Sequence, residues 1–146
     1  MTELIIGAAR LTLPQLRAVL EGPVTVALTP QAWSDVQRGA ETVAAIVAEG
    51  RTVYGINTGF GLLANTSIAP QDLETLRRNL VLSHACGVGP LLPDPVTRLM
   101  MVLKIASLAR GASGVRRQTL EALIALVEAD ILPCIPSKGS VGASGD

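Results

Sequence analysis

Residues 139–146 have a composition that could support chemistry of the backbone itself. They read Gly-Ser-Val-Gly-Ala-Ser-Gly-Asp, with glycine at every third position and small side chains between. Because glycine permits compressed backbone geometry, the amide nitrogen of Gly145 could attack the carbonyl carbon of Ala143 and close a five-membered ring. Loss of one water from the ring and a second from Ser144 would leave a methylidene-imidazolone. No unmodified side chain provides such an electrophile. Proteins that lack this group must bind an electrophile as a cofactor.

Two other interpretations of this segment involve no such chemistry. Glycine, serine and alanine are also typical of a flexible turn, and a second copy of the triplet at residues 112–114 is explained as a linker between two helices. A phosphate-binding loop is excluded, because no Gly-Lys-Ser/Thr closes the glycine run. The triplet alone therefore leaves the electrophile and the turn as alternatives.

A second segment, residues 54–61, interrupts an otherwise helical pattern. It reads Tyr-Gly-Ile-Asn-Thr-Gly-Phe-Gly and holds the only tyrosine and the only phenylalanine of the chain. Aromatic residues concentrated in a glycine-rich segment indicate either a surface loop anchored by its aromatic side chains or a functional loop. Loops carry a disproportionate share of functional residues.

His84 is the only histidine of the chain and therefore its natural proton switch near neutral pH. It follows Ser83 near the end of a predicted helix and precedes a break at residues 87–90, Gly-Val-Gly-Pro. A lone histidine beside Leu80 and Val81 is also typical of a structural residue whose hydrogen bonds are satisfied. The residue by itself fits both roles.

The composition excludes several classes of partner. Twelve basic and twelve acidic residues cancel and form no basic run, so neither a nucleic-acid surface nor an anionic membrane is indicated. The first residues lack a basic region and charges interrupt the apolar segments, so we expect no signal peptide, no membrane span and a cytoplasmic protein. Cys86 and Cys134 form no ligand cluster, so we expect no metal site and two buried apolar thiols. At 49% hydrophobic residues, some apolar surface should need a partner.

The periodicity predicts a mainly α chain with two short strands, at residues 3–6 and 24–28. Thr12 and Gln15 form a capping box that opens a helix ending before Gly22. Thr29-Pro30 opens the next helix, which runs to about Glu49 with Gly50 as its C-cap.

Three further helices are predicted at 70–86, 94–110 and 115–129. In the first, Leu73, Leu76 and Leu80 share one face. The second, capped by Asp94-Pro95, is apolar nearly all round and therefore belongs inside a bundle. Residues 111–114 link the last two helices, and Pro133 and Pro136 end the regular structure.

Three motifs together, residues 54–61, 79–89 and 139–146, closely resemble the aromatic amino acid ammonia-lyases, and in particular their histidine-specific members. The resemblance covers the whole chain in order and spacing. It implies the N-terminal part of a helical-bundle ammonia-lyase fold, mainly α, with short strands and a Tyr/Gly-rich loop near the start. Residues 1–146 would be the N-terminal domain of an enzyme several times longer, whose downstream helical-bundle region is absent from this chain.

The resemblance assigns roles to the motif residues. Ala143, Ser144 and Gly145 match the triplet that cyclises autocatalytically into the 4-methylidene-imidazol-5-one group, without any metal. Tyr54 matches the base that removes the β-proton of the substrate. A phenol is mostly protonated at neutral pH, so its surroundings would have to favour the phenolate.

Ser83 and His84 match a pair that faces the side chain of the substrate. Phenylalanine-specific members are apolar at this pair, and tyrosine-specific members usually have Leu beside the His. The pair therefore favours L-histidine as the substrate and trans-urocanate and ammonia as the products.

The resemblance leaves several points open. Either the amine or the aromatic ring of the substrate could attack the electrophile. A tyrosine or phenylalanine ammonia-lyase, an aminomutase with the same group, and a helical module without activity remain as alternatives. Family members are homotetramers whose active sites combine residues of different subunits, so we expect this chain alone to be inactive and to expose apolar surface.

Overall fold

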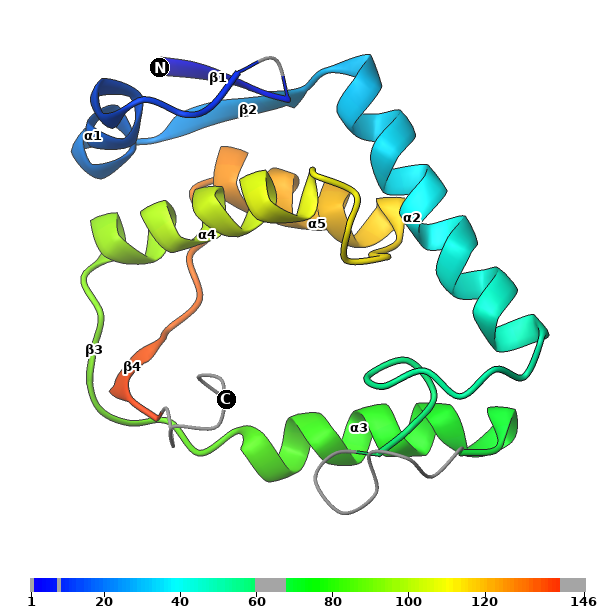
Figure 1. The fold of residues 1–146 in the computed structure, drawn as a ribbon. Helices are drawn as coiled ribbons and strands as arrows, with labels where there is room; N and C mark the ends of the chain where they lie inside the picture. The colour runs from blue at the N-terminus through cyan, green and yellow to red at the C-terminus, as the bar shows by residue number, and fades with distance from the viewer. Residues whose placement is uncertain (1, 8, 60–67, 140–146) are drawn as a thin grey trace. The chain divides into compact units, whose positions relative to one another are not determined.

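The computed structural model describes residues 2–7, 9–59 and 68–139 (Figure 1). These residues form five α-helices, one 3₁₀ helix and four short strands, which confirms the prediction of a mainly α chain. The chain divides into two compact units. Unit 1 comprises residues 1–41 and 91–135, and unit 2 comprises residues 42–90 and 136–146.

Unit 1 begins with two parallel strands joined by a helix. β1 (Thr2–Ile6) pairs with β2 (Val24–Leu28), with Thr2 opposite Val24 and Ile6 opposite Leu28. Parallel strands need a crossover connection, and α1 (Leu13–Glu21) supplies it. Both strands were predicted from the sequence to within one residue.

The N-terminus of α1 confirms the predicted capping box. The backbone N–H and the hydroxyl of Thr12 donate to Gln15 Oε1, at 2.8 Å and 2.9 Å. The glutamine thereby satisfies a backbone donor at the start of the helix. The helix ends at Glu21, before Gly22, as predicted.

The core of unit 1 follows from the period of two in its strands. Leu4 and Ile6 of β1 and Val24 and Val26 of β2 are all buried, because alternate residues of a strand share one face. Figure 1 shows α4 (Asp94–Leu108) and α5 (Arg117–Glu128) on one side of the strands. Burial of each large apolar side chain contributes about 1.5–3 kcal/mol. The remaining core residues are Ala109, which directly follows α4, and the helical residues Val19, Ala32, Val36, Met101, Val102, Ile105, Leu108, Leu120 and Val127.

α4 is buried on one face only. Val96, Met100 and Leu103 are 38%, 44% and 44% exposed, and their spacing of four and three residues places them on one side of the helix. The prediction that α4 belongs inside a bundle therefore depends on parts other than this chain, which covers only one face of the helix. The expectation of exposed apolar surface is confirmed. The N-cap is Pro93, not Asp94, and the helix ends two residues earlier than predicted.

A buried arginine connects three parts of unit 1. Arg98 of α4 is 6% exposed, and its Nε and Nη2 donate to the two carboxylate oxygens of Asp130 at 2.8 Å and 3.2 Å. Its Nη1 donates to the carbonyl of Val19 in α1 at 3.3 Å. The hydrogen bond from Arg98 lowers the pKa of Asp130 below its ordinary 3.8, against a smaller opposing effect of burial.

α2 (Pro30–Ala48) packs closely against the linker that follows α4. A Cβ atom on Gly39 would lie 2.1 Å from the carbonyl oxygen of Gly111, and one on Gly111 would lie 2.3 Å from that of Asp35. The first Ala-Ser-Gly copy thus belongs to a tight linker, as predicted. Gly50, with φ +67°, follows the end of α2 in the left-handed conformation expected of a C-cap glycine.

Unit 2 contains the end of α2, the loop up to residue 59, a short 3₁₀ helix η2 (Pro70–Asp72) and α3 (Leu73–His84). Leu73 is buried, and Leu76 and Leu80 are half-buried, which confirms the predicted face of this helix. α3 ends at His84, two residues earlier than predicted.

Two strands of unit 2 were not predicted. β3 (Val88–Leu91) pairs with β4 (Pro136–Lys138), where the sequence indicated a break and the end of regular structure. Both segments are short and contain proline or glycine, so neither carries a local strand pattern. The strands form because segments far apart in the sequence pair with each other, and proline at the first position of β4 is compatible with a strand.

The two cysteines correct another prediction. Cys86 and Cys134 are exposed rather than buried, because both lie in extended segments outside the helices. Among the described residues, no group of His, Cys, Asp and Glu is arranged to hold a metal ion. In the same part of the chain, every helix is too short or too polar to cross a membrane.

Candidate active site

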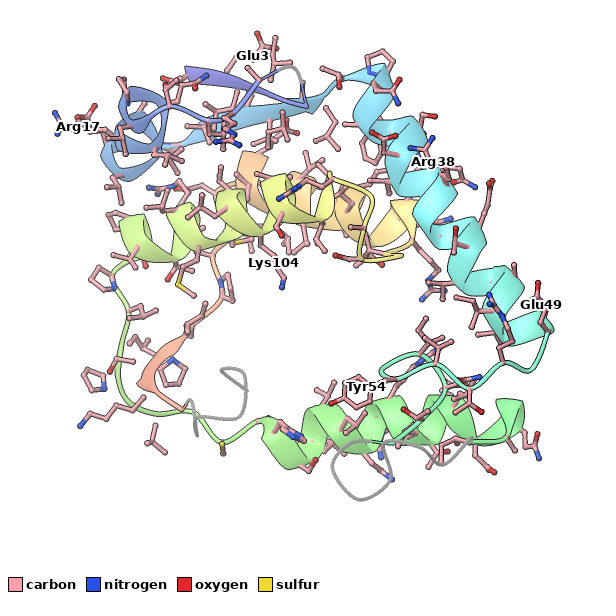
Figure 2. All side chains as sticks on the ribbon, in the orientation of Figure 1. Glu3, Arg17, Arg38, Glu49, Tyr54 and Lys104 are labelled. Atoms are coloured by element: carbon pink, nitrogen blue, oxygen red, sulfur yellow. The ribbon has the colours of Figure 1, made fainter. Side chains whose placement is uncertain are left out.

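Tyr54 lies in a tight turn of unit 2, between α2 and α3 (Figure 2). The Ile56 N–H donates to the Val53 carbonyl at 3.1 Å, which closes the turn. Gly55 has φ +76°, the value that a type II turn requires at its third residue. Tyr54 at the second position is 61% exposed. The turn therefore presents the phenol outward and keeps it out of a core.

Asn57 holds the base of this turn. It is 4% exposed, its Nδ2 donates to the Arg51 carbonyl at 2.7 Å, and its Oδ1 accepts the Val53 N–H at 2.9 Å. The Asn57 carbonyl also accepts the N–H of Ile68 at 2.8 Å. One buried residue thus joins the segment before Tyr54 to the segment that enters α3.

Thr58 forms a second buried anchor. It is 2% exposed, and its Oγ1 accepts the Gly55 N–H at 3.3 Å and donates to the Gly59 carbonyl at 2.9 Å. The polar side chains of Asn57 and Thr58 therefore hold the backbone of this loop; Phe60 lies outside the described residues. No structural role was predicted for Asn57 or Thr58 from the sequence. The signal was available, because Asn and Thr in turns often bond to the neighbouring backbone.

Ser83 and His84 lie at the C-terminal end of α3 and are both exposed. His84 Nδ1 lies 2.8 Å from the Leu80 carbonyl oxygen and 3.0 Å from Ser83 Oγ. Ser83 Oγ donates to the same carbonyl at 3.1 Å. Because a carbonyl oxygen only accepts, the contact with Leu80 is a hydrogen bond when Nδ1 carries a proton; in that neutral tautomer Nε2 would carry the lone pair.

The predicted precursors Ala143, Ser144 and Gly145 lie outside the described residues. Gly139, the first residue of their motif, is described and lies close to Gly87. A Cβ atom on Gly139 would lie 3.1 Å from Gly87 Cα, and Cys86 Sγ donates to the Gly139 carbonyl at 3.8 Å. The motif therefore begins beside the segment that directly follows His84.

The structure thus places Tyr54, Ser83, His84 and Gly139 in one compact unit. Their elements are the turn after α2, the end of α3 and the residue after β4. These segments are separated in the sequence, and the pairing of β3 with β4 keeps the last two near each other.

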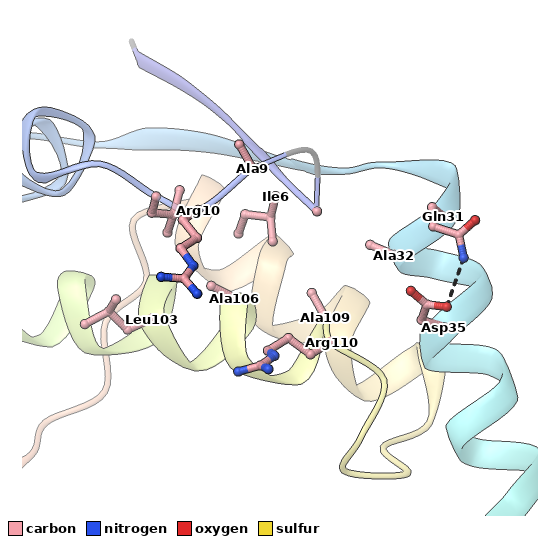
Figure 3. A pocket seen from close by; sticks show the side chains of 12 residues that line it. Ile6, Ala9, Arg10, Gln31, Ala32, Asp35, Leu103, Ala106, Ala109 and Arg110 are labelled. Carbon is pink, nitrogen blue, oxygen red and sulfur yellow. Dashed lines mark hydrogen bonds between the residues drawn. The ribbon is translucent and has the colours of Figure 1, made fainter.

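A separate hollow of about 670 Å³ lies in unit 1 and contains none of the predicted site residues (Figure 3). Arg10 and Arg110 line it together with apolar side chains such as Leu103 and Ala106. Gln31 Nε2 donates to Asp35 Oδ1 at 3.0 Å on its α2 side. The residues that line this hollow all belong to unit 1, whereas Tyr54, Ser83 and His84 belong to unit 2.

Known proteins resemble this chain in sequence and in structure. The family model of the aromatic amino acid lyases matches residues 11–146. The histidine ammonia-lyase of Vibrio cholerae is 58% identical over all 146 residues, which span 29% of that relative. The crystal structure of histidine ammonia-lyase from Trypanosoma cruzi superposes with a TM-score of 0.87 at 34% identity, covering 97% of this chain and 28% of that one. Tyrosine aminomutase from Streptomyces globisporus has a TM-score of 0.88 at 30% identity, covering 97% and 27%.

The chain therefore spans less than a third of the relatives that it matches. The matches confirm the resemblance found in the sequence and the helical ammonia-lyase fold. Since the family model accounts for all but the first ten residues, this chain belongs to the aromatic amino acid lyase family.

Proposed function

We propose that this chain belongs to a histidine ammonia-lyase, which eliminates ammonia from L-histidine to give trans-urocanate in histidine degradation. The observation that carries the proposal is the 58% identity with the Vibrio cholerae enzyme over every residue of the chain. The Ser83-His84 pair supports histidine over an unsubstituted phenyl side chain.

The reaction has two difficulties, because the β-proton of an amino acid is scarcely acidic and its amine is a poor leaving group. A methylidene-imidazolone formed from Ala143, Ser144 and Gly145 would supply the electrophile that activates the substrate. The chain contains the residues that this ring requires, including a glycine at the position of the attacking nitrogen.

Tyr54 is the proposed base. Its phenolate oxygen would accept the β-proton while the C–H electron pair forms the new C=C bond and the C–N electrons leave with ammonia. The exposed position of Tyr54 supports this role, since a base must reach the proton that it removes. The hydrogen bonds of the turn hold the backbone that carries the Tyr54 side chain.

His84 and Ser83 are the proposed groups that bind the substrate side chain. With the proton on Nδ1, His84 Nε2 can accept a hydrogen bond from the N–H of a substrate imidazole. A phenyl ring would leave that acceptor unpaired in a closed site, which costs about 1–3 kcal/mol. The pair therefore contributes to specificity.

The test uses the full-length protein that contains these residues, with urocanate formation followed by ultraviolet absorbance. Tyr54→Phe should lower kcat by about 10²- to 10⁴-fold, the range for loss of a general base. Thr52→Val, an exposed change in the same loop, is the matched control and should retain the wild-type rate. Near-normal turnover by Tyr54→Phe would contradict the assignment.

A second candidate is a tyrosine or phenylalanine ammonia-lyase, or an aminomutase with the same group. The observation in its favour is the TM-score of 0.88 with tyrosine aminomutase. Parallel assays with L-histidine, L-tyrosine and L-phenylalanine, with product analysis for a β-amino acid, separate these reactions. A helical module without activity would give no product from any of them and an uncyclised triplet.

We further propose that the full-length protein is a cytoplasmic homotetramer. The exposed stripe of Val96, Met100 and Leu103 supports association, because apolar stripes of this kind are usually covered. The unpaired thiols of Cys86 and Cys134 fit a reducing compartment. Light scattering on the purified protein and cell fractionation test these two proposals.

A further inference from the structure

We infer that Asn57 and Thr58 are positioning residues for Tyr54, which set the direction of its side chain through the backbone of the turn. This inference rests on the proposed role of Tyr54 as the base. It concerns residues that touch neither substrate nor electrophile in the proposed mechanism.

Asn57 and Thr58 are far more buried than the tyrosine that they hold. Asn57 and Thr58 are 4% and 2% exposed, whereas Tyr54 is 61% exposed. A polar side chain is buried at a cost unless it forms hydrogen bonds, and here the hydrogen bonds go to the turn that carries Tyr54. The buried pair thus fixes an exposed residue three and four positions earlier.

Hydrogen bonds fix the turn on both sides of Tyr54. Asn57 Oδ1 accepts the N–H of Val53, the residue before Tyr54, at 2.9 Å. Thr58 Oγ1 accepts the N–H of Gly55, the residue after Tyr54, at 3.3 Å. Both neighbours of Tyr54 are therefore held by side chains, and the Val53–Ile56 hydrogen bond of 3.1 Å closes the turn between them.

Aspartate, the isostere of Asn57, cannot form the same set of hydrogen bonds. Its Nδ2 donates to the Arg51 carbonyl at 2.7 Å. In Asn57→Asp the same atom becomes an oxygen, which faces that carbonyl as a second acceptor, while Oδ1 still accepts the Val53 N–H. This variant keeps the volume and breaks one specific contact.

The experiment compares two separate variants. One is Asn57→Asp, and the other is Thr58→Val, which removes the hydroxyl and keeps the shape. Thr58→Ser is the conservative variant that retains the hydroxyl. The matched controls are Gln71→Glu, an exposed amide-to-acid change in unit 2, and Thr52→Val, an exposed loss of a hydroxyl in the same loop. All are made in the full-length protein.

Two quantities are measured. One is the ¹⁹F resonance of 3-fluorotyrosine at Tyr54, the only tyrosine of this chain, assigned by its absence in Tyr54→Phe. The other is the separate effect on kcat and KM for L-histidine. Misplacement of a catalytic group by about 1 Å costs about 100-fold, so kcat should fall 10- to 100-fold while KM stays within threefold.

The inference predicts that Asn57→Asp and Thr58→Val both move the Tyr54 resonance and lower kcat, that Thr58→Ser restores both, and that the controls match the wild type. An unchanged resonance with unchanged kcat in either folded variant overturns it, as does an equal loss in Thr58→Ser. If Asn57→Asp fails to fold, the Thr58 series decides alone. If the wild-type protein has no turnover but Asn57→Asp and Thr58→Val still move the Tyr54 resonance, the anchoring of the turn is supported and the proposed enzymatic function is contradicted. The two failures are therefore distinguishable.

Discussion

Unit 1 and unit 2 are stabilised by different kinds of contact. Every member of the buried apolar cluster belongs to unit 1. In the described part of unit 2, Leu73 is the one large apolar side chain that is buried, and the other buried side chains are the polar Asn57 and Thr58. The described candidate site residues, Tyr54, Ser83 and His84, all lie in unit 2.

The apolar core and the described candidate site residues thus lie in different units of this chain. A unit with few buried apolar contacts opens locally at lower free energy than a packed core. Unit 1 is therefore expected to determine the free energy of unfolding of this chain, and unit 2 to respond to changes in individual hydrogen bonds and turns. Four substitutions test this comparison, from the largest expected effect on stability to the smallest.

The strongest test removes a core side chain of unit 1. Leu120 is fully buried, so Leu120→Ala should lower the free energy of unfolding by about 2–5 kcal/mol in urea denaturation. Leu82→Ala, at a position of unit 2 that is 60% exposed, is the control and should change it by less than about 0.5 kcal/mol. Similar losses for the two variants would mean that the units do not differ in this way.

The next test adds one methyl group at a close approach in unit 1. A Cβ on Gly39 would lie 2.1 Å from the Gly111 carbonyl oxygen, so Gly39→Ala should cost about 1–3 kcal/mol. Gly22 has extended backbone and nothing within 4 Å of a new Cβ, so Gly22→Ala should be nearly neutral. If Gly39→Ala were stabilising, as alanine is in an open helix, the close packing of α2 on the linker would be disproved.

A third test strains the Tyr54 turn without adding a clash. Gly55 has φ +76° and nothing within 4 Å of a new Cβ, so Gly55→Ala should cost about 1–2 kcal/mol from backbone conformation alone. The loss should be local to unit 2. Hydrogen exchange of the Ile56 amide, which donates to Val53, should accelerate while amides of α4 keep their protection. Uniform acceleration would indicate that the units unfold together.

The smallest effect concerns pH. The hydrogen bond from Arg98 lowers the folded-state pKa of Asp130 below 3.8, so its stabilisation is complete above that pH and is lost as the pH falls through the lowered pKa. The stability difference between the wild type and Asp130→Asn should therefore be constant above about pH 5 and shrink below about pH 4. Asparagine tolerates the left-handed backbone of this residue, at φ +51°. A difference that grows on acidification would have the wrong sign.

Much of the fold could be predicted because its signals are local. The capping box at Thr12, the C-cap at Gly50 and the face of Leu73, Leu76 and Leu80 depend on residues within a few positions of one another, and each was found. The strands β3 and β4 could not be predicted, because they exist only through pairing across the sequence. The exposed thiols were missed for a related reason, since burial depends on neighbours that are remote in the chain.

In the candidate site too, some features could be predicted from the sequence and others depend on tertiary contacts. Tyr54, Ser83 and His84 were found from residue type and from the resemblance to a family. The hydrogen-bonding role of His84 Nδ1 could be inferred only from its distance to the Leu80 carbonyl. The anchoring of the turn could be inferred only from the burial of Asn57. Tertiary contacts therefore determined how the predicted residues are held, which the sequence pattern did not specify.

The proposed function requires that residues 143–145 become an electrophile in a histidine ammonia-lyase. The most direct measurement is the mass of the tryptic peptide that begins at Gly139, after cleavage at Lys138, from purified full-length protein that has been assayed with L-histidine. If the ring forms, the peptide is two waters lighter than its sequence, in a protein that forms urocanate. A peptide of unmodified mass from the assayed protein would show that residues 143–145 do not form the electrophile.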